Sequence, residues 1–276
     1  MTVGVASTLR GGHVHANGIR QHYLHYGPGD SAAGRPPLVL IPGITSPAIT
    51  WGFVGERFGR AADTYILDVR GRGLSAAGPG LDYSVQAQAA DLLAFVEALA
   101  LEEVDFVGHS MGARIAGHAA ACRPRALRRL VLADPPVCGP GRRPYPAHLD
   151  WYLKSIALAA RGCDAEAMRE YCPTWSDEQR ALRAEWLHTC DPRAVAVSFQ
   201  DFHEVDFHAE LPAIAVPTLL LTAERGDVVP DADVAEIRQL NPLVAHRRVP
   251  GAGHMIPWDN PEGFDAAVSK FLGFSF

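Results

Sequence analysis

Residues 106–117 read FVGHSMGARIAG, and Ser110 stands at the centre of a Gly-x-Ser-x-Gly pentapeptide, residues 108–112. A buried-strand pattern precedes this pentapeptide, and a run of small residues with helical spacing follows it. A sharp turn from strand to helix strains the serine backbone, and glycines are the residues that fit beside it. The free amides and the positive dipole end of the helix would then face the serine hydroxyl. The stretch therefore predicts a nucleophilic serine at a strand–turn–helix junction.

Short apolar runs like the one at 104–108 recur along the chain and predict strands that are buried on both faces. They cover residues 36–43, 64–69, 127–133 and 217–223. Helical patterns alternate with them at residues 84–100, with Ser84 as N-cap, and at 111–121, 231–240 and 262–272. The alternation predicts an α/β fold with a mostly parallel sheet flanked by helices. Upstream of these elements, residues 12–26 alternate between polar and apolar side chains on both sides of Asn17-Gly18, which predicts a β-hairpin.

Residues 137–210 interrupt the alternation of strands and helices. The segment opens with the loop-forming CGPGRRPYP and continues with helical stretches rich in aromatic residues. Ser176 and Gln179 have the spacing of a capping box that starts a helix. We therefore expect a core of residues 1–136 and 211–276, with 137–210 as an inserted helical cap. Such a cap would cover the carboxyl ends of the strands, where open α/β sheets bind ligands.

Composition excludes several classes of function for the 276 residues of the chain. A net charge of −6 argues against a nucleic-acid partner, which would favour a basic face. The apolar runs, such as 92–101, are too short and too broken by charge to span a membrane, and residues 1–12 lack a signal-peptide pattern. The five cysteines are odd in number and scattered, which favours reduced thiols and a cytoplasmic location. The sequence leaves the oligomeric state open.

We expect no metal dependence, although the chain has twelve histidines. Residues 203–208, HEVDFH, lack the spacing that places two histidine ligands on one helical face. The HVH at 13–15 could bind a metal, but alternation along a strand explains it equally well.

A serine nucleophile needs a base, and the base needs an acid that orients it. His254 follows the last strand-like run and precedes the last helical pattern, which matches the nucleophile–acid–base order of such folds. Asp134 and Asp227 each follow a predicted strand, and either could reach His254. Turn capping is the alternative role for both carboxylates, and the spacing does not choose between them.

The developing negative charge on the attacked carbonyl requires backbone donors. We expect the amide of Met111, directly after Ser110, and the amide of Ile44, after Pro42-Gly43, to form this oxyanion hole.

Basic residues stand at two further places. The loop from Asp68 to Ser75 contains Arg70 and Arg72, and we expect its own hydrogen bonds to hold its shape. Arg142 and Arg143, at the entry to the insertion, are better placed to meet an anionic substrate, although a solvated pair is the simpler interpretation.

Four motifs together resemble the α/β-hydrolase family with a helical cap: Pro-Gly after the first long strand, DxRGxGxS at 68–75, GHSMG at 108–112 and AGHM at 252–255. A narrower resemblance lies in ITSPAITWGFV, DPPVCGPGRRPYP, TWSDEQRALRAEWLHTC, DFHEVD and AGHMIPWD, which look like the N-formylmaleamate deformylases of aerobic nicotinate degradation. These matches run from about residue 38 to 260 and include the predicted cap, whose sequence varies greatly between hydrolases of different substrate.

The resemblance implies a small anionic substrate, N-formylmaleamate, and its hydrolysis to maleamate and formate without a cofactor. It also implies that the triad acid follows the strand after the nucleophile helix, which in this sequence is Asp134. The implied catalytic residues are thus Ser110, His254 and Asp134.

Other functions remain open at this level. A carboxylesterase, a lactonase or a hydrolase of carbon–carbon bonds would share GHSMG and the triad, whereas dehalogenases and epoxide hydrolases of this fold use an aspartate nucleophile. A second alternative is a ligand-binding module that has the same fold but catalyses no reaction, because a fold alone does not establish activity. A docking protein would use the cap aromatics Trp151, Tyr152, Trp175 and Trp186 on an outer face, whereas packing inside the cap and lining of its pocket are the simpler roles.

Overall fold

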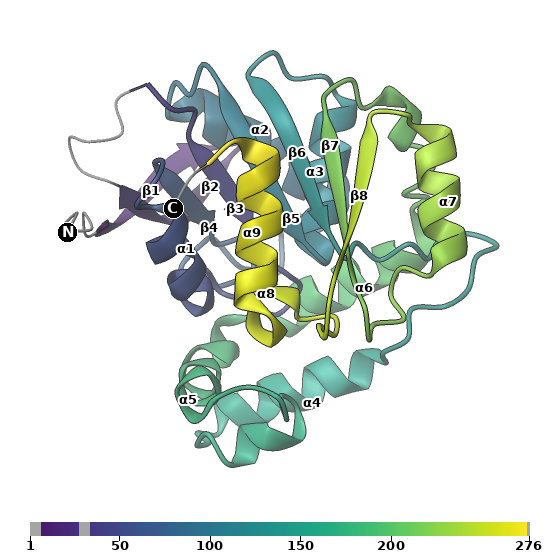
Figure 1. Cartoon of the computed structure of the whole chain (residues 1–276). Helices are drawn as coiled ribbons and strands as arrows, with labels where there is room; N and C mark the ends of the chain where they lie inside the picture. The colour runs from purple at the N-terminus through teal and green to yellow at the C-terminus, as the bar shows by residue number, and fades with distance from the viewer. Residues whose placement is uncertain (1–6, 28–33, 275–276) are drawn as a thin grey trace, which may run out of the picture.

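The computed structural model describes residues 7–27 and 34–274, and its centre is one eight-stranded sheet (Figure 1). The strands are β1 (Thr8–Ala16), β2 (Ile19–Gly27), β3 (Leu38–Ile41), β4 (Thr64–Leu67), β5 (Val104–His109), β6 (Leu127–Ala133), β7 (Thr218–Ala223) and β8 (Val244–Val249). Their order across the sheet is β1-β2-β4-β3-β5-β6-β7-β8. Only the β1–β2 and β2–β4 pairings are antiparallel among them. The predicted α/β fold with a mostly parallel sheet is confirmed.

Helices cover both faces of the sheet because the buried strands present apolar residues alternately to each side. Val39 and Ile41 of β3 pack with α2 (Val85–Ala98), α3 (Met111–Ala121) and α7 (Asp231–Leu240). Leu38 and Leu40 of the same strand belong to a second core cluster with α1 (Gly52–Phe58), α8 (Ile256–Asp259) and α9 (Pro261–Leu272). The sheet therefore separates two apolar cores.

The predicted hairpin and its turn are present at residues 8–27. Asn17 and Gly18 both have positive φ, 48° and 74°, as a two-residue turn between twisted strands requires. Ser84 caps α2 as expected, because its hydroxyl accepts a hydrogen bond from the amide of Ala87. The short helix α1 was not predicted from the sequence, since seven residues carry too little periodicity to stand out.

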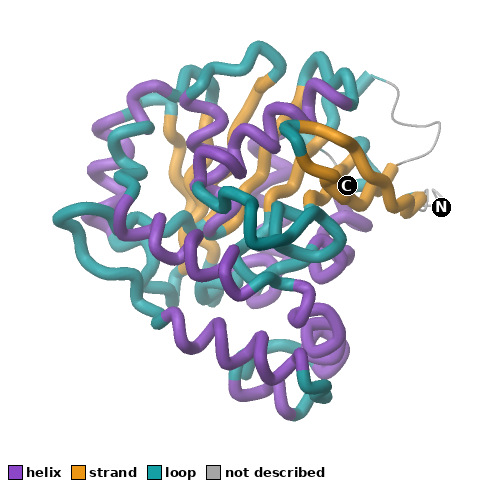
Figure 2. The backbone as a smooth tube through the Cα atoms, turned by 180° about the vertical axis from the view of Figure 1, so that it is seen from behind, coloured by secondary structure: helices purple, strands orange, loops and turns teal. Residues whose placement is uncertain are grey.

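The described elements between β6 and β7 are all helical, and Figure 1 shows α4 and α5 beyond one end of the sheet. They are α4 (Leu149–Ala160), η3 (Ala167–Glu170), α5 (Asp177–Trp186), η4 (Leu187–Thr189), α6 (Pro192–Glu204) and η5 (Leu211–Ala213). The predicted capping box is formed by Ser176 and Gln179 at the start of α5. Seen from behind, a group of helices again projects beyond the ends of the strands (Figure 2). Residues of this helical segment and of the loops after the strands together line the cavity described below.

Among the described residues, no helix has the length and apolar character needed to cross a membrane. Residues 1–6, which carry part of the expectation that no signal peptide is present, lie outside the described residues.

Candidate active site

Ser110 occupies the tight turn between β5 and α3, with φ 55° and ψ −120°. This conformation is strained for a residue with a side chain, and the amide of Ser110 is fixed by donating to the carbonyl of Ala133 at 2.8 Å. A Cβ on Gly112 would lie 1.9 Å from the carbonyl oxygen of Ile41, and a Cβ on Gly108 would lie 2.3 Å from that of Gly112. The glycines of the pentapeptide are thus required by close backbone packing around the serine.

His254 lies between Ser110 and Asp134 and is hydrogen-bonded to both. Its Nε2 is 3.0 Å from the Ser110 Oγ, and its Nδ1 is 2.7 Å from the Asp134 Oδ2. A carboxylate only accepts hydrogen bonds, so Nδ1 carries the proton and Nε2 is free to accept the serine proton. Asp134 is almost fully buried, at 1% exposure, and its Oδ1 accepts from the amide of Ala223. The three side chains are arranged as a nucleophile, a base and an orienting acid require.

Asp227, the alternative acid, is exposed on the wall of the cavity. The structure thus brings Asp134 against the ring of His254 and leaves Asp227 outside the hydrogen-bonded chain.

His109, next to the nucleophile, contacts both the backbone and the ring of His254. Its Nε2 donates to the backbone carbonyl of His254 at 2.8 Å, and the two rings are 5.1 Å apart. Burial, with the nearby His254 as a second cause, lowers the pKa of His109 to about 3. His109 is therefore neutral at physiological pH and adds no positive charge beside the triad. The sequence offered no signal for this role beyond its place in the pentapeptide.

Tyr145 contributes a hydroxyl that no motif in the sequence predicts. It lies 3.2 Å from the Nε2 of His254, in the segment that leads from β6 into α4. Burial raises the pKa of Tyr145 well above its ordinary value, so the phenol stays protonated. Its only signal in the sequence is an aromatic between Pro144 and Pro146, which is common in ordinary loops.

The loop after β3 carries the predicted oxyanion donor Ile44, and the amides of Ile44 and Met111 have no acceptor in the described structure. Two arginines hold this loop from different sides. The Arg72 Nε donates to the Ile44 carbonyl at 3.2 Å, and Arg183 of α5 donates to the carbonyl of Thr45 at 3.0 Å. The loop is therefore fixed by both the core and the cap.

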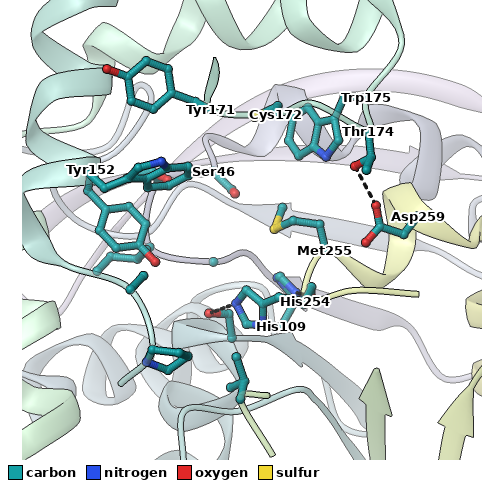
Figure 3. Close-up of a pocket in the computed structure, with 18 of the residues that line it drawn as sticks. Ser46, His109, Tyr152, Tyr171, Cys172, Thr174, Trp175, His254, Met255 and Asp259 are labelled. Atoms are coloured by element: carbon teal, nitrogen blue, oxygen red, sulfur yellow. Dashed lines mark hydrogen bonds between the residues drawn. The ribbon is translucent and has the colours of Figure 1, made fainter. Parts of the chain in front are cut away.

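A cavity of about 560 Å³ opens above Ser110 and His254, which is within the usual range for small-molecule sites. Figure 3 shows Tyr152, Tyr171 and Trp175 of the cap across the cavity from His254 and His109. Of the aromatics considered as a docking face, Trp151, Tyr152 and Trp175 line this cavity. Their position supports the pocket-lining alternative over an outer docking surface.

The cap contacts the core through a pair of stacked indoles. Trp175 and Trp258 are parallel within 2°, with their ring centroids 4.9 Å apart. Beside them, the Thr174 hydroxyl donates to Asp259 at 2.9 Å (Figure 3). These contacts fix one wall of the cavity relative to the triad.

The Asp68–Ser75 loop is held by hydrogen bonds of its own Asp and Arg side chains, as expected. Asp68 accepts from the amide of Leu74, and Arg72 Nη1 donates to the Arg70 carbonyl. Asp68 also accepts from the amide of Ala48, which follows the loop that carries Ile44 and so helps to position it.

Neither arginine at the cap entry lines the cavity. Arg142 binds Glu236 through both terminal nitrogens, and Arg143 donates to the carbonyl of Val228. The idea that they meet an anionic substrate is therefore not supported by their positions.

One group among the described residues has ligand atoms near enough for a metal ion: His208, Asp233 and Glu236, all within 4.8 Å of one another. The guanidinium of Arg142 already supplies positive charge to these two acids. The group lies apart from the residues that line the cavity.

Comparison with known proteins places this geometry in a family. A model of the alpha/beta hydrolase family matches residues 38–267. The chain is 57% identical over 268 residues to N-formylmaleamate deformylase of Pseudomonas putida KT2440, covering 97% of this chain and 98% of that relative. A putative carbamate hydrolase, RutD of Caulobacter sp. strain K31, is 26% identical over 262 residues, covering 91% of this chain and 94% of that relative.

The structural comparison agrees with the sequence matches. The crystal structure of the N-formylmaleamic acid deformylase Nfo of Pseudomonas putida S16 superposes with a TM-score of 0.89. It is 53% identical, and the match covers 94% of this chain and 100% of that chain. The resemblance inferred from the motifs is confirmed. The chain belongs to the alpha/beta hydrolase family.

Proposed function

We propose that this protein hydrolyses the N-formyl amide bond of N-formylmaleamate to give maleamate and formate, a step of nicotinate degradation. The observation that carries the proposal is the 57% identity to the deformylase of Pseudomonas putida, which extends over 97% of the chain and therefore includes the cap. The cap provides about half of the residues that line the cavity and so helps to determine which substrate fits. The hydrogen-bonded Ser110, His254 and Asp134 supply the chemistry that this reaction requires.

In the first half of the proposed reaction, the Ser110 Oγ attacks the formyl carbon while His254 Nε2 accepts the serine proton. Asp134 stabilises the imidazolium that forms, because its carboxylate accepts from Nδ1. The negative oxygen of the tetrahedral intermediate is bound by the amides of Ile44 and Met111. Each donor of such a hole stabilises the transition state by about 3–4 kcal/mol.

The carbon–nitrogen bond then breaks, and the imidazolium of His254 gives its proton to the departing nitrogen. That nitrogen is shared by two acyl groups, so it leaves as the primary amide of maleamate, which is a better leaving group than an amine. In the second half, His254 deprotonates a water molecule that attacks the formyl-serine. Formate leaves, and the proton returns to Ser110.

We infer that the reaction takes place in the cytoplasm. The five cysteines are free thiols, three of them buried, which is the pattern of a protein that keeps its cysteines reduced.

A substrate panel tests the proposed function. The kcat/KM of the purified protein is measured on N-formylmaleamate, 4-nitrophenyl acetate and a small enol-lactone. The proposal predicts a preference for N-formylmaleamate of several orders of magnitude, because the binding groups of the cavity would be matched to it. A higher kcat/KM on the ester or the lactone would assign the same triad to another reaction.

A further inference from the structure

Arg183 places a buried positive charge at the wall of the cavity. It belongs to α5 of the cap, is 4% exposed, and is the one arginine among the described residues that lines the cavity. The face of its guanidinium lies over the Trp175 ring, with 5.6 Å between Cζ and the ring centroid. This contact and its hydrogen bonds hold the charge in a fixed position.

The hydrogen bonds of Arg183 leave much of its guanidinium unused. Nη1 donates to the Thr45 carbonyl at 3.0 Å and Nη2 to the Thr45 hydroxyl at 3.1 Å, while the buried Nε has no partner. A guanidinium has five N–H groups, so these two bonds occupy fewer than half of them. In the described structure, no ion pair joins Arg183 to a carboxylate.

Other buried arginines of the chain are more fully bonded. Arg180, one turn earlier in α5, donates to Asp177 and to the carbonyls of Ala165 and Trp175. Arg114 donates to the carbonyls of Pro136, Cys138, Asp201 and Val205. A buried charge is costly unless counterions or hydrogen bonds satisfy it. Among the described residues Arg114 has no carboxylate partner either, but four carbonyls accept from its guanidinium. Arg183 therefore differs from both arginines in having unused donors beside a cavity.

The position of Thr45 relates this charge to the reacting atoms. Thr45 directly follows Ile44, whose amide we assign to the oxyanion hole, and consecutive Cα atoms are about 3.8 Å apart. An anionic group bound by Arg183 would therefore lie a short distance from the attacked carbonyl. The other cationic candidates, Arg142 and Arg143, are bonded elsewhere.

We propose that Arg183 binds the carboxylate of the substrate and thereby selects anionic amides over neutral ones. The inference rests on the proposed function and names the residue that fixes its substrate class. The guanidinium fork matches a carboxylate in shape and charge. Once bound, the carboxylate supplies the counterion that the folded protein lacks, and it holds the flat maleamate chain with its formyl group over Ser110.

The test compares an anionic substrate with its neutral counterpart in one variant. Arg183→Met keeps a long apolar side chain against Trp175 but removes the charge. We expect the kcat/KM for N-formylmaleamate to fall about a hundredfold or more, and that for its methyl ester to change several times less. Arg183→Lys, which keeps the charge but not the fork, should recover part of the loss. An equal loss for the acid and its methyl ester in Arg183→Met would overturn the proposal.

A control variant separates recognition from a merely structural effect. Arg180→Met removes a buried arginine of the same helix that does not line the cavity, and it should affect the acid and the ester alike. If Arg180→Met reproduces the selective loss seen in Arg183→Met, the selectivity comes from cap structure and the proposal is wrong.

Failure of the proposed function can be distinguished from failure of this inference. If the wild-type protein does not hydrolyse N-formylmaleamate, the same variants are assayed on 3-carboxyphenyl formate and phenyl formate, which differ only in the carboxylate. A wild-type preference for the carboxylate that Arg183→Met abolishes would support the role of Arg183 without the deformylase assignment. No preference in the wild-type protein would overturn both.

Discussion

The Oδ2 of Asp134 lies 2.7 Å from the Nδ1 of His254, although 120 residues separate the two in the chain. Asp134 reaches the ring because its own backbone turns at the end of β6, with a positive φ of 47°. Its amide donates to the Leu221 carbonyl of the neighbouring strand at 2.8 Å, which fixes this turn. The acid position is therefore set by the backbone at one strand end.

This relationship predicts different effects for the two candidate acids. Asp134→Asn should lower kcat by three to four orders of magnitude, because an amide no longer stabilises the imidazolium and can favour the wrong tautomer. Asp227→Asn should leave kcat within a few-fold of the wild type, since Asp227 lies outside the hydrogen-bonded chain. Steady-state kinetics of both variants makes the comparison. The opposite ranking would assign the acid to Asp227.

Tyr145→Phe tests the hydroxyl that lies 3.2 Å from the Nε2 of His254. When Nε2 becomes protonated, the tyrosine oxygen can accept its hydrogen bond and keep the ring oriented. We expect kcat to fall about tenfold, the size of one lost hydrogen bond of about 1.5 kcal/mol, with little change in thermal stability. Tyr171→Phe is the matched control, because Tyr171 lines the same cavity without contacting the triad in any described hydrogen bond. Equal effects of the two variants would contradict a role at His254.

His109 should make the stability of the protein depend on pH. Its pKa is about 3 in the folded state against an ordinary value of 6.5, so between these values the unfolded chain binds the extra proton. The stability that this group contributes is complete above pH 6.5 and is lost as the pH falls toward 3. Between pH 7 and pH 5, the titration of His109 alone should lower the free energy of unfolding by about 2 kcal/mol.

The measurement is urea unfolding at pH 7 and pH 5 for the wild type and for His109→Gln. Glutamine retains a donor for the His254 carbonyl but does not titrate. The wild type should lose about 2 kcal/mol more than the variant between the two pH values. An equal loss in both proteins would show that His109 is not held neutral by burial.

Gly112→Ala tests the packing of the strand–turn–helix junction. The added Cβ would lie 1.9 Å from the Ile41 carbonyl oxygen and 2.6 Å from that of Pro42, and a backbone segment cannot move aside easily. We expect a loss of about 3 kcal/mol or more in the free energy of unfolding, together with reduced activity. Gly80→Ala is the control, because a Cβ there meets nothing within 4 Å. If both variants unfold at the same urea concentration as the wild type, the junction is looser than the structure indicates.

Much of the core was predictable because its signals are local. The strand at 104–108, the turn at Asn17-Gly18 and the N-cap at Ser84 each depend on a few consecutive residues, and each was found where it was expected. The same holds for the capping box at Ser176. Short runs of apolar, turn-forming and capping residues carry this information without knowledge of the tertiary fold.

The parts of the site that the sequence did not reveal depend on side-chain direction. Asp134 and Asp227 both follow strands, and only the backbone turn at Asp134 brings its carboxylate to His254. Tyr145 approaches the same histidine from an irregular segment, whose path no periodic pattern describes. Arg142 and Arg143 stand out in the sequence as a basic pair, whereas Arg183 lies within an ordinary helical pattern. Which arginine meets the cavity follows from how the cap lies on the core.

The proposed reaction depends on attack by Ser110 on the formyl amide of N-formylmaleamate. Its most direct test is the rate of formate release from that substrate by the purified wild-type protein and by Ser110→Ala. We expect rapid release of one formate for each maleamate formed, and a rate at least about a thousandfold lower in the variant. No release by the wild type, or release that survives in Ser110→Ala, would contradict it.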